Sequence, residues 1–336
     1  MEPLRIGILG AARIVDNALA VPSRTAPVRL VVIAARDRRR AEMLAATHGI
    51  ERVVDTYADV VSDNEIDVVY NPLVNSLHAP WNRLAIAAGK HVFSEKPFAS
   101  NAVEADAVHL AGQHAGVYVV DGFHYLYHPV TQRLHSLLES GELGDLERVE
   151  VTMATPPPEP DDPRWSFALA GGALMDLGCY CLHANRTLAR WGGGEPSLVS
   201  AQGGGREGAT GVDEWVIADL RFPNGAIGRA SCHMAADVTE MTFRIVGTLG
   251  EATASRFVRP DLDDRVLVVS QNGSRTEHLG TKSSYAFQLE ALCNLIRNDV
   301  PMPTQSDDAV KTMRLVDESY RAIGFPTRTS TQTSGS

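Results

Sequence analysis

Short apolar runs that alternate with helix-like segments constrain the first third of this 336-residue chain most strongly. Such alternation is typical of a parallel sheet with crossover helices, in which ligands bind beyond the carboxyl ends of the strands. We therefore expect a doubly wound α/β domain with a site at one sheet edge. The expected strands are residues 4–9, 29–34, 67–70, 91–94 and 117–120, and the expected helices are 38–47, 80–88 and 102–114.

The pattern changes after about residue 125 to longer β-type runs separated by turns. Asn224-Gly225 lies between two such runs, 216–222 and 226–234, which is a strong hairpin signal, and Asn272-Gly273 is a second turn signal. We predict an α+β C-terminal domain with a large, mostly antiparallel open sheet. Helices are expected over 173–190, 284–297 and 307–323. The predicted domains are 1–125 and 126–326, and the Ser/Thr-rich segment 327–336 is expected to be a disordered tail.

The overall composition excludes several classes of partner. A net charge of -10 argues against nucleic acid, because phosphate binding needs clustered positive charge. We find no apolar stretch of the roughly 20 residues that span a bilayer, and no basic region before the first apolar run, so neither a membrane nor a signal peptide is expected. Four cysteines in so long a chain indicate reduced thiols and a cytoplasmic protein. No metal site is expected.

A dinucleotide site is predicted where the first strand ends. Gly10, Ala12, Arg13 and Ile14 follow that strand and open a helix, but only the first glycine of the Gly-x-Gly-x-x-Gly fingerprint is present. The second strand ends in Ala35-Arg36, where NAD-binding domains place an acid for the ribose 2′-hydroxyl. The missing acid and the adjacent guanidinium suit a 2′-phosphate, and Arg39 or Arg40 could add charge. The sequence thus predicts a Rossmann domain that prefers NADP(H) over NAD(H). The alternative is a solvated basic helix start.

Five motifs, in order along the chain, resemble the Gfo/Idh/MocA oxidoreductases, in the branch with xylose and dihydrodiol dehydrogenases and glucose-fructose oxidoreductase. They are residues 7–14, Asn75-Ser76-Leu77-His78, residues 89–92, Glu95-Lys96-Pro97 and residues 172–180, which end in Asp176-Leu177-Gly178-Cys179-Tyr180. The resemblance implies that Lys96 and Tyr180 stand beside the nicotinamide and that Asp176 completes the group. The residues expected to contact the cofactor on the loops after the fourth and fifth strands are Pro72, Leu73, Asn75, His78, Glu95 and Lys96.

The chain departs from the pattern of these relatives at three positions. Val74 stands where relatives often have proline, Asp121 replaces a usual glutamate, and Leu126 replaces a common arginine. These positions are expected along the edge that faces the substrate. These departures therefore bear on the identity of the substrate and less on the type of reaction. A sugar, a ketosugar or a cyclic polyol would each fit.

The chemistry needs a proton donor and acceptor at the substrate oxygen. Tyrosine has an ordinary pKa of about 10, which is too high for an efficient base near neutral pH, and a nearby ammonium such as that of Lys96 would lower it. Asp176, Tyr180 and His183 have spacings that put them on one helix face. A partly buried helix with a hydrogen-bonded Tyr–Asp pair is the alternative.

Five residues are expected to contact the substrate. For each of them, a purely structural role is the alternative. They are His124, Tyr125, Arg164, Trp165 and His183. Two other functions remain open for the whole chain: a non-catalytic NADP-sensing regulator of the same fold, and an NAD-using glycosidase of related fold. Resemblance to the family also implies a homodimer or homotetramer formed through the open face of the C-terminal sheet.

Overall fold

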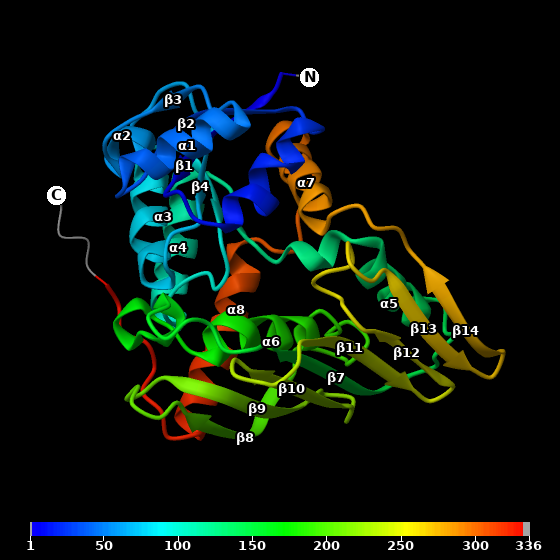
Figure 1. The fold of residues 1–336 in the computed structure, drawn as a ribbon. Helices are drawn as coiled ribbons and strands as arrows, with labels where there is room; N and C mark the ends of the chain where they lie inside the picture. The colour runs from blue at the N-terminus through cyan, green and yellow to red at the C-terminus, as the bar shows by residue number, and fades with distance from the viewer. Residues whose placement is uncertain (1, 332–336) are drawn as a thin grey trace. The chain divides into compact units, whose positions relative to one another are not determined.

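A computed structural model describes residues 2–331, and their contacts divide into two compact units (Figure 1). The first unit comprises residues 1–123, 285–311 and 329–336, and the second comprises 124–284 and 312–328. The two domains predicted from the sequence were each continuous. A boundary drawn where the residue pattern changes cannot show that a later segment, here 285–311, returns to the first unit.

The first unit contains a six-stranded parallel sheet in the order β3-β2-β1-β4-β5-β6. This order is that of a Rossmann fold, as predicted. Its interior strands are buried on both faces because helices cover both, so they read as continuous apolar runs. The strands are β1 Leu4–Leu9, β2 Val28–Ala34, β3 Arg52–Val53, β4 Val68–Asn71, β5 His91–Ser94 and β6 Val119–Asp121. The helices are α1 Arg38–His48, α2 Tyr57–Val61, α3 His78–Ala87, α4 Ala102–Ala115 and most of α7 Ser284–Asn298.

The caps of these helices follow from local sequence. Asp37 caps α1 by accepting from the Arg39 amide, and Asn101 caps α4 by accepting from the Glu104 amide. Gly49 and Gly116 end the same two helices in the left-handed conformation that glycine adopts without strain. The helix expected after the first strand is only a π-helical turn, η1 Asp16–Ala20, followed by a short 3₁₀ turn, η2 Pro22–Arg24.

The second unit contains an eight-stranded sheet in the order β14-β13-β12-β11-β7-β10-β9-β8. Only β7 and β10 pair in parallel, so the prediction of a mostly antiparallel sheet is confirmed. Asn224-Gly225 joins β9 to β10 as the turn signal predicted. The strands are β7 Leu146–Ala154, β8 Ser197–Gly205, β9 Asp213–Arg221, β10 Ile227–His233, β11 Glu240–Gly247, β12 Gly250–Ala254, β13 Arg265–Ser270 and β14 Gly273–His278.

One face of this sheet is covered by helix α6, Cys179–Arg186, which packs on β7 and β10. The preceding turn, η7 Leu174–Gly178, is π-helical, so the helix predicted over 173–190 is shorter and wider at its start. The other helices are α5 Pro129–Glu139 and α8 Ser306–Ala322, of which residues 312–322 belong to this unit; the 3₁₀ turns are η4 His124–Tyr127, η5 Pro163–Trp165 and η6 Phe167–Leu169.

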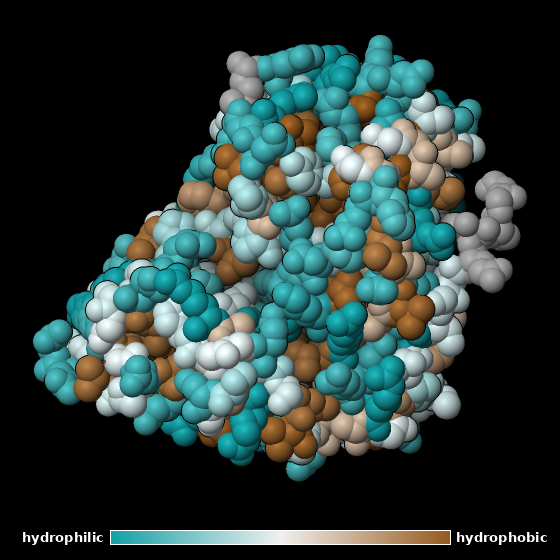
Figure 2. Space-filling model, turned by 180° about the vertical axis from the view of Figure 1, so that it is seen from behind, coloured by the Kyte–Doolittle hydropathy of each residue, from teal (hydrophilic) through white to brown (hydrophobic). Residues whose placement is uncertain are grey.

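The stretch Phe167–Arg186 is long and apolar enough to cross a bilayer by length and composition alone. The expectation that the chain has no apolar stretch of this length is therefore wrong. Because 78% of its most apolar window is buried inside the protein, it has the character of a core helix. On the face shown in Figure 2, hydrophobic residues lie scattered among hydrophilic ones, which is ordinary for a folded protein.

The expected disordered tail is wrong for residues 327–331. The Arg328 side chain is fully buried and pairs with Asp213 at 2.6 Å, and the Thr331 amide donates to Glu104. Composition suggested disorder because Ser and Thr dominate this segment, but one arginine with a buried acceptor fixes its position. Residues 332–336 lie outside the described part of the chain.

Candidate functional site

The loop after β1 has the tight turn that a dinucleotide site needs. Gly10 adopts φ +86°, and its amide donates to the Ala34 carbonyl at 2.7 Å. This positive φ strains any residue with a side chain, and a Cβ here would also lie 2.9 Å from the Leu73 side chain. Ala12 and Ile14 are half-buried and Arg13 is exposed. The first glycine of the fingerprint is therefore required by the backbone, while the rest of the loop lacks the other two.

The guanidinium groups of the basic run after β2 differ in whether they bind other protein groups. Arg38 binds Glu42 and Asp55, and Arg40 donates to the Ala11 carbonyl at 2.7 Å. Arg36 follows half-buried Ala35 and is exposed, and within residues 2–331 its guanidinium has no ion-pair or hydrogen-bond partner. Arg40 thus ties α1 to the glycine loop, and Arg36 remains available to an anionic ligand.

A cavity of about 260 Å³ lies between the glycine loop and α1. Three of its lining residues were predicted as cofactor contacts: Ala12, Arg13 and Arg40. Sequence reasoning missed the others on α1, although they recur at helical spacing from Arg40. They are Met43, Leu44, Thr47 and His48, of which His48 is hydrogen-bonded to Asp16 at 2.7 Å.

His78 ties together the loops that follow β4 and β5. Its two ring nitrogens lie 2.7 Å from the carbonyl oxygens of Leu73 and Pro97, and the side chain is 1% exposed. Burial lowers the pKa of His78. Its contacts place it behind the loops, where it holds Leu73 and the residue after Lys96. Of the other residues predicted here, Pro72 is buried, and Leu73, Asn75 and Lys96 are half-buried.

Two buried carboxyl groups lie near Lys96 in the first unit. Glu95 accepts a hydrogen bond from the Tyr70 hydroxyl at 2.8 Å, and the Asp121 carboxylate accepts from the Gly122 amide at 2.8 Å. Burial raises the pKa of both, and the positive charge of Lys96 acts in the opposite direction.

Tyr180 is the centre of a hydrogen-bonded group in the second unit. Its hydroxyl lies 3.2 Å from Nε2 of His124, whose Nδ1 lies 2.8 Å from the hydroxyl of Ser284. Tyr180 is 6%, His124 2% and Ser284 1% exposed. Ser284 was not predicted, and no local pattern could have found it, because it is 160 residues away from His124 along the chain.

Tyr125 and His183 form a second tyrosine–histidine pair beside the first. The Tyr125 hydroxyl lies 2.6 Å from Nδ1 of His183, and both side chains are buried. Tyr125 also packs edge-on against Phe257, with ring centroids 5.0 Å apart. Both residues were predicted as substrate contacts, and in the structure their polar atoms bind each other.

Asp176 is joined to the loop that precedes its helix. Its carboxylate lies 3.5 Å from Arg164, which is also held by Asp162 through two hydrogen bonds of 2.9 and 3.0 Å. Trp165 is 7% exposed, and the Arg206 guanidinium covers its ring at 4.1 Å. Arg164 and Trp165 were predicted to cover a substrate ring, and here both have protein partners.

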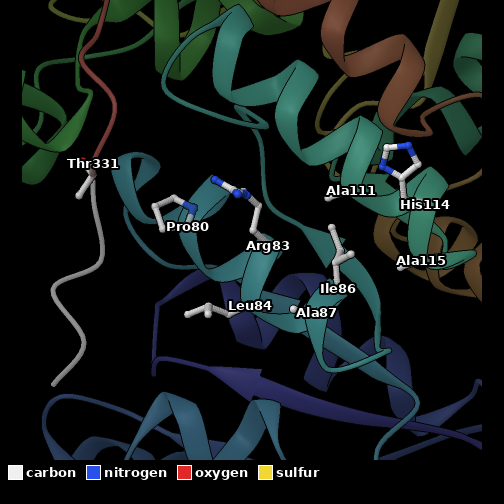
Figure 3. Close-up of a pocket in the computed structure, with 9 residues that line it drawn as sticks. All are labelled: Pro80, Arg83, Leu84, Ile86, Ala87, Ala111, His114, Ala115 and Thr331. Carbon is white, nitrogen blue, oxygen red and sulfur yellow. The ribbon is translucent and has the colours of Figure 1, made fainter.

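A separate surface groove lies along α3 and α4 (Figure 3). Its lining includes Arg83, Leu84 and Ile86 from α3 and Ala111 and His114 from α4. None of the residues predicted as functional lines it. Among residues 2–331, no group of three or more His, Cys, Asp or Glu side chains could hold a metal ion.

Comparison with known proteins identifies the family. Residues 4–123 match the description "Oxidoreductase family, NAD-binding Rossmann fold", and residues 131–253 match the GFO/IDH/MocA C-terminal domain. D-xylose 1-dehydrogenase (NADP(+)) 2 of Haloferax volcanii is 31% identical over 322 residues, which cover 95% of this chain and 97% of the relative. The chain belongs to the Gfo/Idh/MocA family of oxidoreductases. It is an enzyme, a dehydrogenase or reductase, and the resemblance found in its motifs is confirmed.

Solved structures with the same fold extend over nearly the whole chain. KijD10, a 3-ketoreductase from Actinomadura kijaniata in complex with NADP and TDP-benzene, gives a TM-score of 0.87 at 24% identity, over 95% of this chain and 98% of that one. A levoglucosan dehydrogenase in complex with NADH and levoglucosan gives 0.88 at 22% identity, over 96% and 97%. At this identity they establish the fold alone.

Proposed function

We propose that this enzyme is an NADP(H)-dependent oxidoreductase that interconverts a hydroxyl and a carbonyl group of a sugar, ketosugar or cyclic polyol. Tyr180 acts as the acid and base, and Lys96 assists it. The observation that carries the proposal is the position of the Tyr180 hydroxyl. Tyr180 ends the Asp-x-Gly-x-Tyr motif at the start of α6, and its hydroxyl lies 3.2 Å from Nε2 of His124. The named activity of the xylose dehydrogenase supports the substrate class.

The residues of the first unit fit a dinucleotide. Gly10 provides a turn that a Cβ would fill, and the Arg36 guanidinium has no protein partner within residues 2–331. Arg36, together with the cavity-lining Arg13 and Arg40, would hold the phosphate-bearing adenosine part, because guanidinium groups bind phosphate bidentately. Leu73, Asn75 and Lys96 would hold the nicotinamide part, which supplies or accepts the hydride when bound.

The protein's own side chains then have to move one proton at the substrate oxygen. In reduction, the Tyr180 O–H bond breaks and the proton bonds to the carbonyl oxygen; in oxidation it moves the other way. In this proposal Lys96 supplies a cation beside the phenol, where it would favour the phenolate, because a cation stabilises an anion close to it. Asp176, held by Arg164, positions the start of the helix that carries Tyr180.

Replacement of Tyr180 by phenylalanine tests this role, because it keeps the ring and removes the transferable proton. We expect Tyr180→Phe to lower kcat by about 10²–10⁴, with cofactor affinity within a few-fold of the parent. The measurement is single-turnover hydride transfer, first with D-xylose and NADP⁺ and then with a panel of sugars, ketosugars and polyols. Hydride transfer by the variant as fast as by the parent would show that Tyr180 is structural.

Lys96→Met is the companion variant. It should lower the rate and shift the limb of the pH–rate profile that reports the phenol toward higher pH, since the phenol loses a cation that favours its ionisation. An unshifted limb would separate Lys96 from proton transfer and leave it a role in binding alone.

A further inference from the structure

The phenol of a proton-transferring tyrosine has to exchange its proton with something other than the substrate in every turnover. In reduction it ends as a phenolate and must be reprotonated, and in oxidation it must lose the proton that it has taken up. Within the second unit, Nε2 of His124, a titratable nitrogen, lies 3.2 Å from the Tyr180 hydroxyl. This distance is within the normal range for a hydrogen bond.

The ring of His124 is fixed for such an exchange. Nδ1 lies 2.8 Å from the Ser284 hydroxyl, so the two nitrogens have different partners and Nε2 is directed at the phenol. The rings of His124 and Tyr180 meet edge-on, with centroids 6.0 Å apart. His124 starts the short turn η4, whose next residue, Tyr125, is anchored by His183. Ser284 thus orients the imidazole of His124, and His183 anchors the residue that follows it in the turn.

Ser284 is buried and ends the chain of hydrogen bonds that begins at the Tyr180 hydroxyl. It begins α7 after the exposed residues Thr281 and Lys282 and the half-buried Ser283. Tyr180 from α6 contacts His124, and Asp261 from the loop before β13 interacts with its charge. The pKa of Asp261 is lowered, chiefly by its hydrogen bonds from Arg259 and in smaller part by charge on His124.

We infer that His124 is the proton-exchange partner of Tyr180, with Ser284 as the residue that orients its ring. The inference rests on the proposed role of Tyr180. After Tyr180 has given its proton to a carbonyl oxygen, the Nε2–H bond of the His124 imidazolium breaks and its proton forms a new O–H bond on the phenolate. The neutral imidazole keeps its Nδ1–H bond to Ser284 and later takes a proton from water. In oxidation each proton moves in reverse.

This assignment replaces the expectation that His124 contacts the substrate. Glutamine at position 124 is the informative substitution, because its amide can still donate a hydrogen bond to Tyr180 but cannot titrate. We expect His124→Gln to lower the single-turnover rate by at least about 10²-fold, the lower end of the range for a positioned acid or base, and to remove one ionisation from the pH–rate profile. Imidazole added to His124→Ala should restore a large part of the rate, because the substitution leaves a space of that shape.

His135→Gln is the matched control. His135 is another histidine of the second unit that contacts a hydroxyl, that of Thr187 at 3.2 Å, and it has no contact with Tyr180. This control should keep the parent's rate and pH profile. Ser284→Ala should fall between the control and His124→Gln, since it removes only the orienting bond.

A substrate-free measurement separates failure of this inference from failure of the proposed function. Tyrosine labelled with ¹³C at Cζ reports the phenol by NMR, and the Tyr180 signal is assigned by its absence in Tyr180→Phe. In the parent, the chemical shift of this signal should change with pH as His124 gains or loses its proton. In His124→Gln that change should disappear. A response that is absent from the parent or persists in His124→Gln would overturn the inference.

The kinetic results distinguish the two proposals in the same way. If Tyr180→Phe is slow while His124→Gln matches the parent in rate and pH profile, the relay is wrong and the proposed function stands. If His124→Gln raises only KM, His124 is a substrate contact and the relay is again wrong. If Tyr180→Phe is as fast as the parent, the proposed function itself fails.

Discussion

At the scale of a single residue, Arg36 is the side chain on which the proposed cofactor preference rests. It is exposed after Ala35, and no acid stands at that position to repel a 2′-phosphate. We expect NADP(H) to bind more tightly than NAD(H), because a guanidinium forms charge-assisted hydrogen bonds with phosphate. Arg36→Ala should weaken NADP(H) binding by roughly 1.5–3 kcal/mol and change NAD(H) binding little.

Titration calorimetry with both cofactors checks this expectation. Arg38→Ala is the matched control from the same basic run, because its guanidinium already binds Glu42 and Asp55. It should leave the preference unchanged. Equal affinity of the parent for the two cofactors would contradict the role given to Arg36.

His135 gives a pH dependence of stability. Burial lowers the pKa of His135 to about 4, and the nearby His183 adds to the effect. The unfolded chain, with a histidine pKa of about 6.5, binds a proton below that pH that the folded protein does not bind. Stability is therefore complete above pH 6.5 and falls as the pH drops toward 4, by up to about 1.4 kcal/mol per pH unit for this group. Urea unfolding of His135→Gln should show a shallower loss over this range, and an equal slope would contradict the assignment.

At the scale of elements, the sequence predicts best where periodicity is strong. Strands β1 and β5 have the predicted bounds, and α1, α3 and α4 agree within two residues. The π-helical turns at Asp16–Ala20 and Leu174–Gly178 were not predicted, since apolar spacing does not distinguish a π-turn from an α-turn. The catalytic candidates Tyr180 and Asp176 came from a motif, whereas their partners His124 and Arg164 became visible as partners only in three dimensions.

The start of the helix that carries Tyr180 depends on a buried ion pair. Asp213 accepts from the Leu174 amide at 2.6 Å and pairs with Arg328, which also donates to the Gly171 carbonyl at 2.7 Å. The Arg328 guanidinium lies 4.2 Å from the centre of the Tyr320 ring. Arg328 and Asp213 are both fully buried, so loss of either leaves an uncompensated charge.

We expect Arg328→Met to lower the free energy of unfolding by about 3–5 kcal/mol, as for other broken buried pairs. The double variant Arg328→Met/Asp213→Asn should lose clearly less than the sum of the two single losses, because each single change already breaks the same pair. Urea denaturation of the parent, both single variants and the double variant measures this. Additive losses would show that the two residues act independently.

At the scale of the whole molecule, the open face of the second unit's sheet bears on assembly. The resemblance implied assembly through this open face, and the outward residues of its central strands carry ion pairs. Arg244 on β11 binds Glu150 on β7 at 2.7 Å and also binds Glu251 on β12, while Val149 and Val151 of β7 point to the covered side. Alternation along β7 fixes which residues face outward, but the pairing of strands distant in sequence decides which charges meet.

We propose that this enzyme forms a homodimer through that face, in which the ladder of Glu150, Arg244 and Glu251 contributes to a symmetric interface. Arg244→Glu would place three carboxylates side by side, so it should shift the protein toward monomer, whereas the parent should be dimeric at micromolar concentration. Arg190→Glu is the control, because it also removes an exposed ion pair, with Glu139, but lies outside the sheet.

Light scattering with size separation gives the mass of each variant, and thermal unfolding confirms that each remains folded. Since exposed charges are screened beyond about 10 Å at 0.1 M salt, added salt should reduce the difference between Arg244→Glu and the parent. A monomeric parent, or a dimer that Arg244→Glu leaves intact, would place any assembly on another surface.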